Sequence, residues 1–207
     1  MRADKAGLPS DRFQLRQGDA AKDLDAEPAG SRDAVLAVDC AYQCVPLPTV
    51  LLALQRADAP PRSFNTRRAF LSSAARLLVP GGHLALTDLV LPSTPLSRLD
   101  TLLLHLLLLL AGCPTANLVS ERAYRAQLVT AGFDAASIEL RDISSDVWPG
   151  FCRFVREREA RLGGRGRGVL GSKWTGLVRY ASVVEWYAGL KSGRPKMRYC
   201  LVAARKA

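Results

Sequence analysis

The chain of 207 residues is 48% hydrophobic and 23% charged, which is ordinary for a folded globular domain. Its formal net charge of +10 is compatible with an anionic binding partner. Residues 1–16 contain no apolar run of the kind found in signal peptides. The most apolar stretch, residues 102–111, is half as long as the roughly 20-residue helix that spans a membrane. We therefore expect one cytosolic domain without a membrane span.

The first half of the chain alternates strands with a helix. Residues 13–20 predict a short strand that ends on a polar turn. Residues 33–39 predict an apolar strand that is buried on both faces of a parallel sheet. From residue 64 apolar side chains recur on one helical face, and residues 80–82 (PGG) are expected to end this helix. Residues 83–91 predict a third strand, and this order indicates a doubly wound α/β fold. The expected apolar face of the helix consists of Phe70, Leu71, Ala74, Leu77 and Leu78.

Beyond the third strand the pattern changes to two helices and a strand. Residues 96–111 are so apolar that we expect a packed lid rather than a surface helix. Ser120 is a suitable N-cap and Gly132 a suitable C-terminal stop for a helix between them. Residues 137–143 alternate between apolar and polar side chains, which predicts a half-buried strand.

The last part of the chain predicts helices at residues 151–162 and 172–190 and a final strand at residues 197–204. With the strand at residues 137–143, this final strand suggests an antiparallel hairpin at a sheet edge. Basic residues are concentrated at residues 153–167, and the GGRGRG tract at residues 163–168 could be an RNA-binding tract or a loop between the two helices. We favour the loop, so a basic RNA-associated protein is the alternative function.

The cysteines give no sign of a disulfide framework or a metal site. They form no C-x-x-C pair and their number is odd. Cys40 and Cys44 could be combined with His83 and His105, but this spacing supports no closed zinc site. We expect small buried thiols and no metal. The five cysteines are Cys40, Cys44, Cys113, Cys152 and Cys200.

Five segments, in this order and spacing, resemble class I S-adenosylmethionine-dependent methyltransferases of the small-molecule, type 11-like kind. They are QGDA at 17–20, AVLAVDCAY at 34–42, LLVPGGHLALTDLVL at 77–91, AGF at 131–133 and MRYCLVAARK at 197–206. The resemblance covers nearly the whole chain. It implies a Rossmann-like α/β fold and an enzyme that transfers a methyl group from S-adenosyl-L-methionine to a small acceptor.

The resemblance also indicates which parts are missing. The family's first strand, its glycine-rich G-x-G-x-G loop and the acidic residue that ends its second strand have no counterpart before Gln17. The family's strand order is 3-2-1-4-5-7-6. We therefore expect an N-terminally truncated, incomplete Rossmann-like sheet that lacks the first two strands and carries an apolar helical cap. Such a sheet has unpaired edges, so an inactive fragment that acts through a partner at a strand edge is a further alternative.

We expect a single partial domain over residues 1–207, with cap regions at residues 95–131 and 149–190 and an insertion at residues 44–63. Without this insertion the sequence would read DCAYQ-FNTRRAF, with Gln43 in place of a family histidine. Codons CAG for Gln43 and AGC for Ser63 allow a splice junction that yields CAC, a histidine codon. We therefore hypothesise that residues 44–63 are a translated intron. A natural helical insertion bounded by prolines is the alternative.

The resemblance implies two groups of cofactor-binding residues. In the turn at residues 17–20, Asp19 would accept a hydrogen bond from the adenine amino group, and the backbone N–H of Ala20 would bind the same ring. Residues 39–41 would lie at the carboxyl end of a strand, where open α/β sheets bind ligands. The expected cofactor-binding residues are Gly18, Asp19, Ala20, Asp39, Cys40 and Ala41.

Three residues are candidates for the reaction itself. Methyl transfer is an in-line displacement that depends on positioning, and Tyr42 could pack over the methionine part of the cofactor or contact the acceptor. Gln43 can hydrogen-bond but cannot act as a general base. Asp88, at the end of the strand at residues 83–91, either faces the substrate cavity or caps a turn.

Two apolar helices could cover a lipophilic acceptor. One is the helix at residues 96–111, and the other is the aromatic helix at residues 172–190. Core packing explains the same side chains equally well. The aromatic residues concerned are Trp174, Tyr180, Trp186 and Tyr187.

Overall fold

The computed structural model describes residue 24 and residues 27–38, 66–110, 117–162 and 181–207. The predicted strand at residues 13–20 and the insertion at residues 44–63 lie outside these ranges, as do Trp174 and Tyr180. Within the described ranges, no helix is both long enough and apolar enough to cross a membrane.

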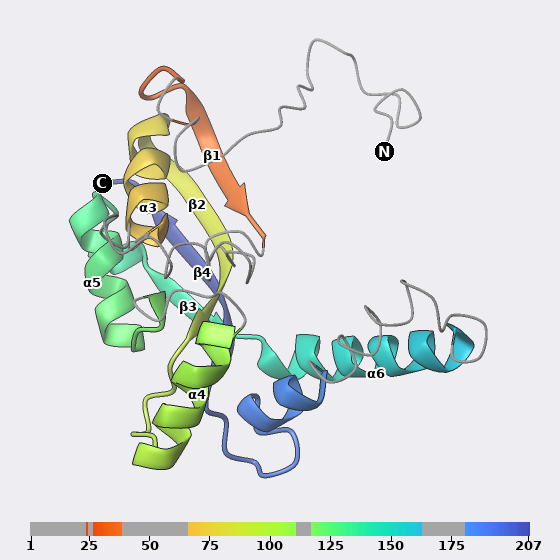
Figure 1. Cartoon of the computed structure of the whole chain (residues 1–207). Coiled ribbons are helices and arrows are strands. Elements are labelled where there is room, and N and C mark those ends of the chain that lie inside the picture. Colours follow the sequence, from red (N-terminus) through yellow and green to blue (C-terminus); the bar gives the residue numbers. More distant parts are fainter. Residues whose placement is uncertain (1–23, 25–26, 39–65, 111–116, 163–180) are drawn as a thin grey trace, which may run out of the picture.

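The described strands form one four-stranded sheet in the order β1-β2-β4-β3. These strands are β1 (Arg32–Ala37), β2 (Leu78–Val90), β3 (Glu139–Asp142) and β4 (Arg198–Arg205). β1 pairs in parallel with β2, whereas β4 is antiparallel to both β2 and β3. This arrangement confirms the parallel pair and the antiparallel edge that the sequence predicted, and Figure 1 shows the twisted sheet.

The Pro-Gly-Gly segment belongs to β2 and does not end the preceding helix, so that prediction is wrong. α3 (Thr66–Leu77) ends one residue before β2 begins. The register of β1 against β2 shifts between Arg32 and Ala34, which leaves room for residues 79–82. Gly81, with φ at +76°, donates its N–H to the carbonyl of Lys206, which anchors this irregular stretch to the last strand.

α3 and α5 (Glu121–Ala131) cover the side of the sheet on which the first hydrophobic core lies. All five residues predicted for the apolar face of α3 are buried, as are Tyr124 and Leu128 of α5. The predicted ends of α5 are also confirmed. The Ser120 hydroxyl accepts from the Ala123 N–H, and Gly132 caps the helix in the left-handed conformation.

A second apolar core lies beyond the carboxyl ends of β1 and β2 (Figure 1). It gathers side chains from α4 (Arg98–Leu110), α6 (Ser144–Leu162) and the helical residues 181–187. Trp148 is central to it, because its ring lies 5.6 Å from the ring of Tyr187 and 5.1 Å from that of Tyr199. α6 begins at Ser144, earlier than the predicted start at residue 151.

Two predictions of burial are wrong. β1 was expected to be buried on both faces, but Leu36 is 73% exposed and the following Val38 is 61% exposed. The reason is that β1 is the edge strand of the described sheet, with β2 as its neighbour on one side only. The helix at α4 was expected to be a packed lid, yet it buries only one side, through Leu104 and Leu108.

Candidate functional site

The carboxyl ends of the parallel strands β1 and β2 meet at one edge of the sheet, where ligands bind in open α/β folds. Ala37, the last residue of β1, is in register with Leu86. Asp88 lies two residues further along β2, just past the end of β1. It is the one predicted site residue within the described part of the chain. The predicted site residues outside it are Gly18, Asp19, Ala20, Asp39, Cys40, Ala41, Tyr42 and Gln43.

Asp88 is fully buried and accepts hydrogen bonds from three neighbours. The Arg67 guanidinium binds both carboxylate oxygens, with 2.8 Å from Nε to Oδ2 and 3.1 Å from Nη2 to Oδ1. The Tyr124 hydroxyl donates to Oδ2 at 2.8 Å, and the Leu89 backbone N–H donates to Oδ1 at 2.7 Å. The carboxylate is therefore hydrogen-bonded on both oxygens, as buried charges in proteins usually are.

Arg67 and Tyr124 also contact each other. The Arg67 guanidinium carbon lies 4.6 Å from the centre of the Tyr124 ring, close enough for a cation–π interaction. Arg67 Nη1 is buried and has no hydrogen-bond partner within the part of the chain that the structure describes. The three side chains thus tie α3, β2 and α5 together at the carboxyl end of β2.

The environment fixes the protonation of this cluster. Burial raises the pKa of Asp88, while the Arg67 charge and the donated hydrogen bonds oppose that shift. Burial, followed by the negative charge of Asp88, raises the pKa of Tyr124 well above its usual value of 10. Tyr124 therefore stays protonated and acts as a donor. Because its lone pairs are already occupied, the Asp88 carboxylate is poorly suited to removing a proton from an acceptor.

Neither Arg67 nor Tyr124 was predicted from the sequence to be a partner of Asp88. A signal was available for Arg67. It precedes Phe70, Leu71 and Ala74 by three, four and seven positions, so a charged residue lies within the apolar stripe of α3. A charge at such a position is rarely buried unless it is paired, and Asp88 is its partner.

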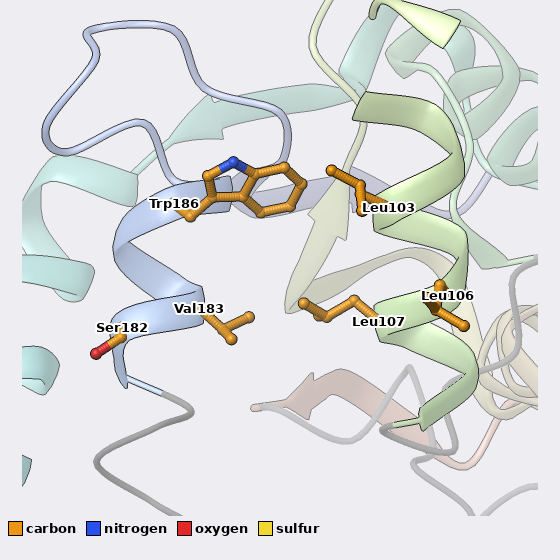
Figure 2. Close-up of a pocket in the computed structure, with 6 residues that line it drawn as sticks. All are labelled: Leu103, Leu106, Leu107, Ser182, Val183 and Trp186. Carbon is orange, nitrogen blue, oxygen red and sulfur yellow. The ribbon is translucent and has the colours of Figure 1, made fainter. Parts of the chain in front are cut away.

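An apolar pocket of about 350 Å³ lies between α4 and the helical residues 181–187 (Figure 2). Its lining residues are Leu103, Leu106, Leu107, Ser182, Val183 and Trp186. The Trp186 indole also lies under the Lys196 ammonium, which is 4.8 Å from the ring centre. Of the aromatic residues expected near an acceptor, Trp186 lines this pocket, whereas Tyr187 is buried against Trp148.

The overall arrangement matches solved structures along nearly the whole chain. The [4+2]-cyclase SpnF is 21% identical with a TM-score of 0.61, and 99% of this chain covers 59% of that protein. A protein of Galdieria sulphuraria described as a sarcosine dimethylglycine methyltransferase is 14% identical with a TM-score of 0.65, over 99% and 63% of the two chains. A SAM-dependent methyltransferase of Geobacter sulfurreducens, in complex with S-adenosyl-L-homocysteine, is 14% identical with a TM-score of 0.56, over 99% and 68%. The chain has the Rossmann-like methyltransferase fold.

The chain covers only part of the length of these proteins. The chain spans about 60% of the length of the first two of these proteins, 59% of one and 63% of the other. No protein-family model and no curated protein matches the chain by sequence. The similarity is therefore one of fold, since fewer than a quarter of the residues are identical in each pair.

The two cysteines within the described ranges are buried thiols, as predicted. Cys152 and Cys200 are both free and buried. Burial raises the pKa of Cys152, and it raises the pKa of Cys200 to about 11. Both groups are thus protonated near neutral pH and are poor nucleophiles. Within the described ranges, no cluster of three or more His, Cys, Asp or Glu side chains could hold a metal ion.

Proposed function

We propose that this chain is part of an S-adenosyl-L-methionine-dependent methyltransferase that acts on a small, lipophilic acceptor in the cytosol. The observation that carries the proposal is the match of 99% of the chain to the methyltransferase from Geobacter sulfurreducens, whose bound ligand is S-adenosyl-L-homocysteine. That ligand is what S-adenosyl-L-methionine becomes when it has given up its methyl group. The residue assignments come from the resemblance of the sequence to the same class of enzyme.

The cofactor would be held by residues from two segments, the turn that contains Gly18, Asp19 and Ala20 and the segment Asp39, Cys40 and Ala41 after β1. When bound, it supplies an electrophilic methyl group on a sulfonium sulfur. Tyr42 and Gln43 would follow directly and orient the acceptor. Gln43 can donate and accept hydrogen bonds but takes up no proton, which favours an acceptor that needs positioning more than deprotonation.

We assign Asp88 to this site as a residue that acts through its neighbours. Its position just past the end of β1 and its bonds to Arg67 and Tyr124 support this role. The cluster would fix the spacing of α3 and α5 at the edge of the sheet where the acceptor reacts. Correct positioning of the reacting groups accounts for much of the rate of displacement reactions, because a small misplacement lowers that rate strongly.

The lipophilic nature of the acceptor is supported by the pocket between α4 and residues 181–187. Five of its six lining side chains are carbon-rich, from Leu103, Leu106, Leu107, Val183 and Trp186. The volume of about 350 Å³ falls within the range of small-molecule sites. The two helical segments that line the pocket lie beyond the carboxyl ends of β1 and β2 (Figure 1).

We further propose that the outer edge of β1 pairs with another polypeptide strand when the methyltransferase is active. The exposed Leu36 of this edge strand and the exposed Val38 just after it support the proposal, because apolar strand edges pair readily.

Calorimetric titration of the chain with S-adenosyl-L-methionine tests the proposed function. We expect binding that weakens at least about tenfold in Asp19→Ala and Asp39→Ala. Asp33→Ala is the matched control, since Asp33 is exposed at the start of β1. The same titration is repeated with residues 44–63 deleted and Gln43→His, where we expect tighter binding. Absence of binding in both forms would contradict the proposal.

Binding alone does not establish methyl transfer, because SpnF has this fold and is a [4+2]-cyclase. Transfer of radiolabelled methyl to a panel of lipophilic hydroxyl and amine compounds therefore completes the test. Salt-dependent RNA binding without cofactor binding would instead favour the RNA-associated alternative.

A further inference from the structure

α4 carries an apolar stripe that faces away from the core. Leu99, Leu102, Leu103 and Leu106 are 65%, 66%, 40% and 51% exposed. Their spacing of three, four and seven positions places them on one side of the helix. The opposite side is used for packing, since Leu104 and Leu108 are buried in the second core. The helix is therefore apolar on two sides, one packed in the core and one exposed.

Single exposed leucines are common on protein surfaces, but a continuous stripe of four marks an interaction surface. The apolar pocket extends this stripe, because Leu103 and Leu106 belong to both. Trp186 on the far wall of the pocket points towards α4 (Figure 2). Tryptophan side chains are enriched at the boundary between water and lipid.

A set of cations adjoins one end of the stripe. The Lys196 ammonium lies 3.8 Å from the Asp100 carboxylate in the first turn of α4, which places the end of the segment at residues 189–196 beside that turn. This segment also carries Lys191 and Arg194, both exposed, and α4 itself begins with the exposed Arg98. Lys196 itself is buried, so we call the exposed Arg98, Lys191 and Arg194 the cationic rim.

Acidic neighbours neutralise the positive charge around the cationic rim only in part. Asp100 faces Lys196, and Glu185 binds both Lys191 and Arg156. Arg98 and Arg194 add two further positive charges at the exposed surface. The chain as a whole carries a net charge of +10, so its surroundings reinforce this local excess.

We propose that the α4 stripe and the cationic rim dock this chain on an anionic lipid surface. An apolar helix side that enters the acyl boundary, together with cations that meet anionic headgroups, is the combination that holds peripheral helices on membranes. α4 would lie along the surface, and the pocket beside it would open towards the lipid. The positive charges at the end of the stripe favour this partner over an uncharged apolar protein surface.

Vesicle flotation of the full chain tests the proposal. We expect binding to vesicles of phosphatidylcholine mixed with phosphatidylglycerol, weaker binding to phosphatidylcholine alone, and a decrease with salt. Leu102→Lys combined with Leu106→Lys, and Arg98→Glu combined with Arg194→Glu, should each weaken binding at least about tenfold.

Matched controls carry the same chemical changes elsewhere. Val129→Lys places a charge on an exposed apolar position of α5, and Arg68→Glu with Arg122→Glu reverses two exposed charges on α3 and α5. These variants should bind vesicles like the parent chain. Circular dichroism and urea midpoints verify that each variant is folded.

Three results would overturn the proposal. One is a parent chain that does not bind the anionic vesicles. The second is an equal loss of binding in the stripe variants and the controls. The third is a parent chain that sediments as a dimer without binding vesicles while the Leu102→Lys, Leu106→Lys variant sediments as a monomer, since the stripe would then be a subunit interface.

Discussion

Arg67 of α3 binds both carboxylate oxygens of Asp88 on β2, at 2.8 Å and 3.1 Å, and both side chains are almost completely withdrawn from solvent. The attraction within such a buried pair mainly offsets the cost of removing two charges from water. The pair therefore adds little stability compared with apolar residues of the same size. Removal of one partner is costly, because the other charge stays buried without compensation.

Arg67→Met should lower the free energy of unfolding by about 3–5 kcal/mol, because it leaves the Asp88 carboxylate buried without its cation. Asp88→Leu should cost a similar amount. The double variant should be clearly more stable than the sum of the two losses implies, and urea denaturation of all four proteins measures this coupling. Additive losses would show that the two residues do not act as a pair.

Tyr124→Phe removes the hydroxyl that donates to Asp88 and should lower the free energy of unfolding by about 1.5–3 kcal/mol, since the acceptor is charged. Tyr199→Phe is the control, because its hydroxyl donates to the neutral Thr87 hydroxyl at 2.9 Å. That change should cost only about 0.5–1.5 kcal/mol in the same urea experiment. Equal losses would argue against an ionised Asp88.

Two glycine-to-alanine changes should have opposite signs. Gly132 caps α5 with φ at +102°, where a Cβ atom is strained, so Gly132→Ala should destabilise the chain by about 1–2 kcal/mol. Gly150 lies inside α6, and a Cβ atom there meets open space. Gly150→Ala should therefore stabilise by up to about 1 kcal/mol. Thermal unfolding of both variants measures these effects, and midpoint shifts of the same sign in both would contradict the prediction.

Stability should fall in acid partly through Glu185. A hydrogen bond from Arg156 holds the pKa of Glu185 at about 2, below its usual 4.5. Because the folded state has the lower pKa, the contribution is fully present above pH 4.5 and is lost as the pH falls towards 2. Glu185 alone changes the free energy of unfolding by at most about 1.4 kcal/mol per pH unit. Glu185→Gln should flatten the dependence of the urea midpoint on pH in that window.

Local signals in the sequence were enough to predict most elements. Ser120 and Gly132 fixed the ends of α5 through cap chemistry that depends on neighbouring residues alone. The apolar face of α3 could be predicted equally well, because four of its five predicted residues follow the helical period within α3, and the fifth, Leu78, begins β2. Such signals can be recognised in the sequence alone, since they need no distant partner.

Features that depend on distant partners were missed. The burial of Arg67 requires Asp88 and Tyr124, which lie far away in the sequence. The predicted start of α6 was also wrong, but for a local reason. It was placed after Pro149, whereas the Ile143 carbonyl accepts from the N–H groups of Asp146 and Val147 and the helix begins before the proline. The exposure of Leu36 could not be foreseen from its own strand, because it depends on what lies beside β1. The proposed cofactor residues lie outside the described ranges and remain predictions.

The position of β4 in the sheet has a consequence for the order of folding. β4 lies between β2 and β3 and is the last of these strands to be synthesised. Until it leaves the ribosome, one side of β2 lacks its partner and β3 lacks its only neighbour within the described sheet. Pairing across so long a stretch of sequence is slow to form. In nascent chains, the apolar β2 should therefore remain accessible to chaperones until β4 has left the ribosome.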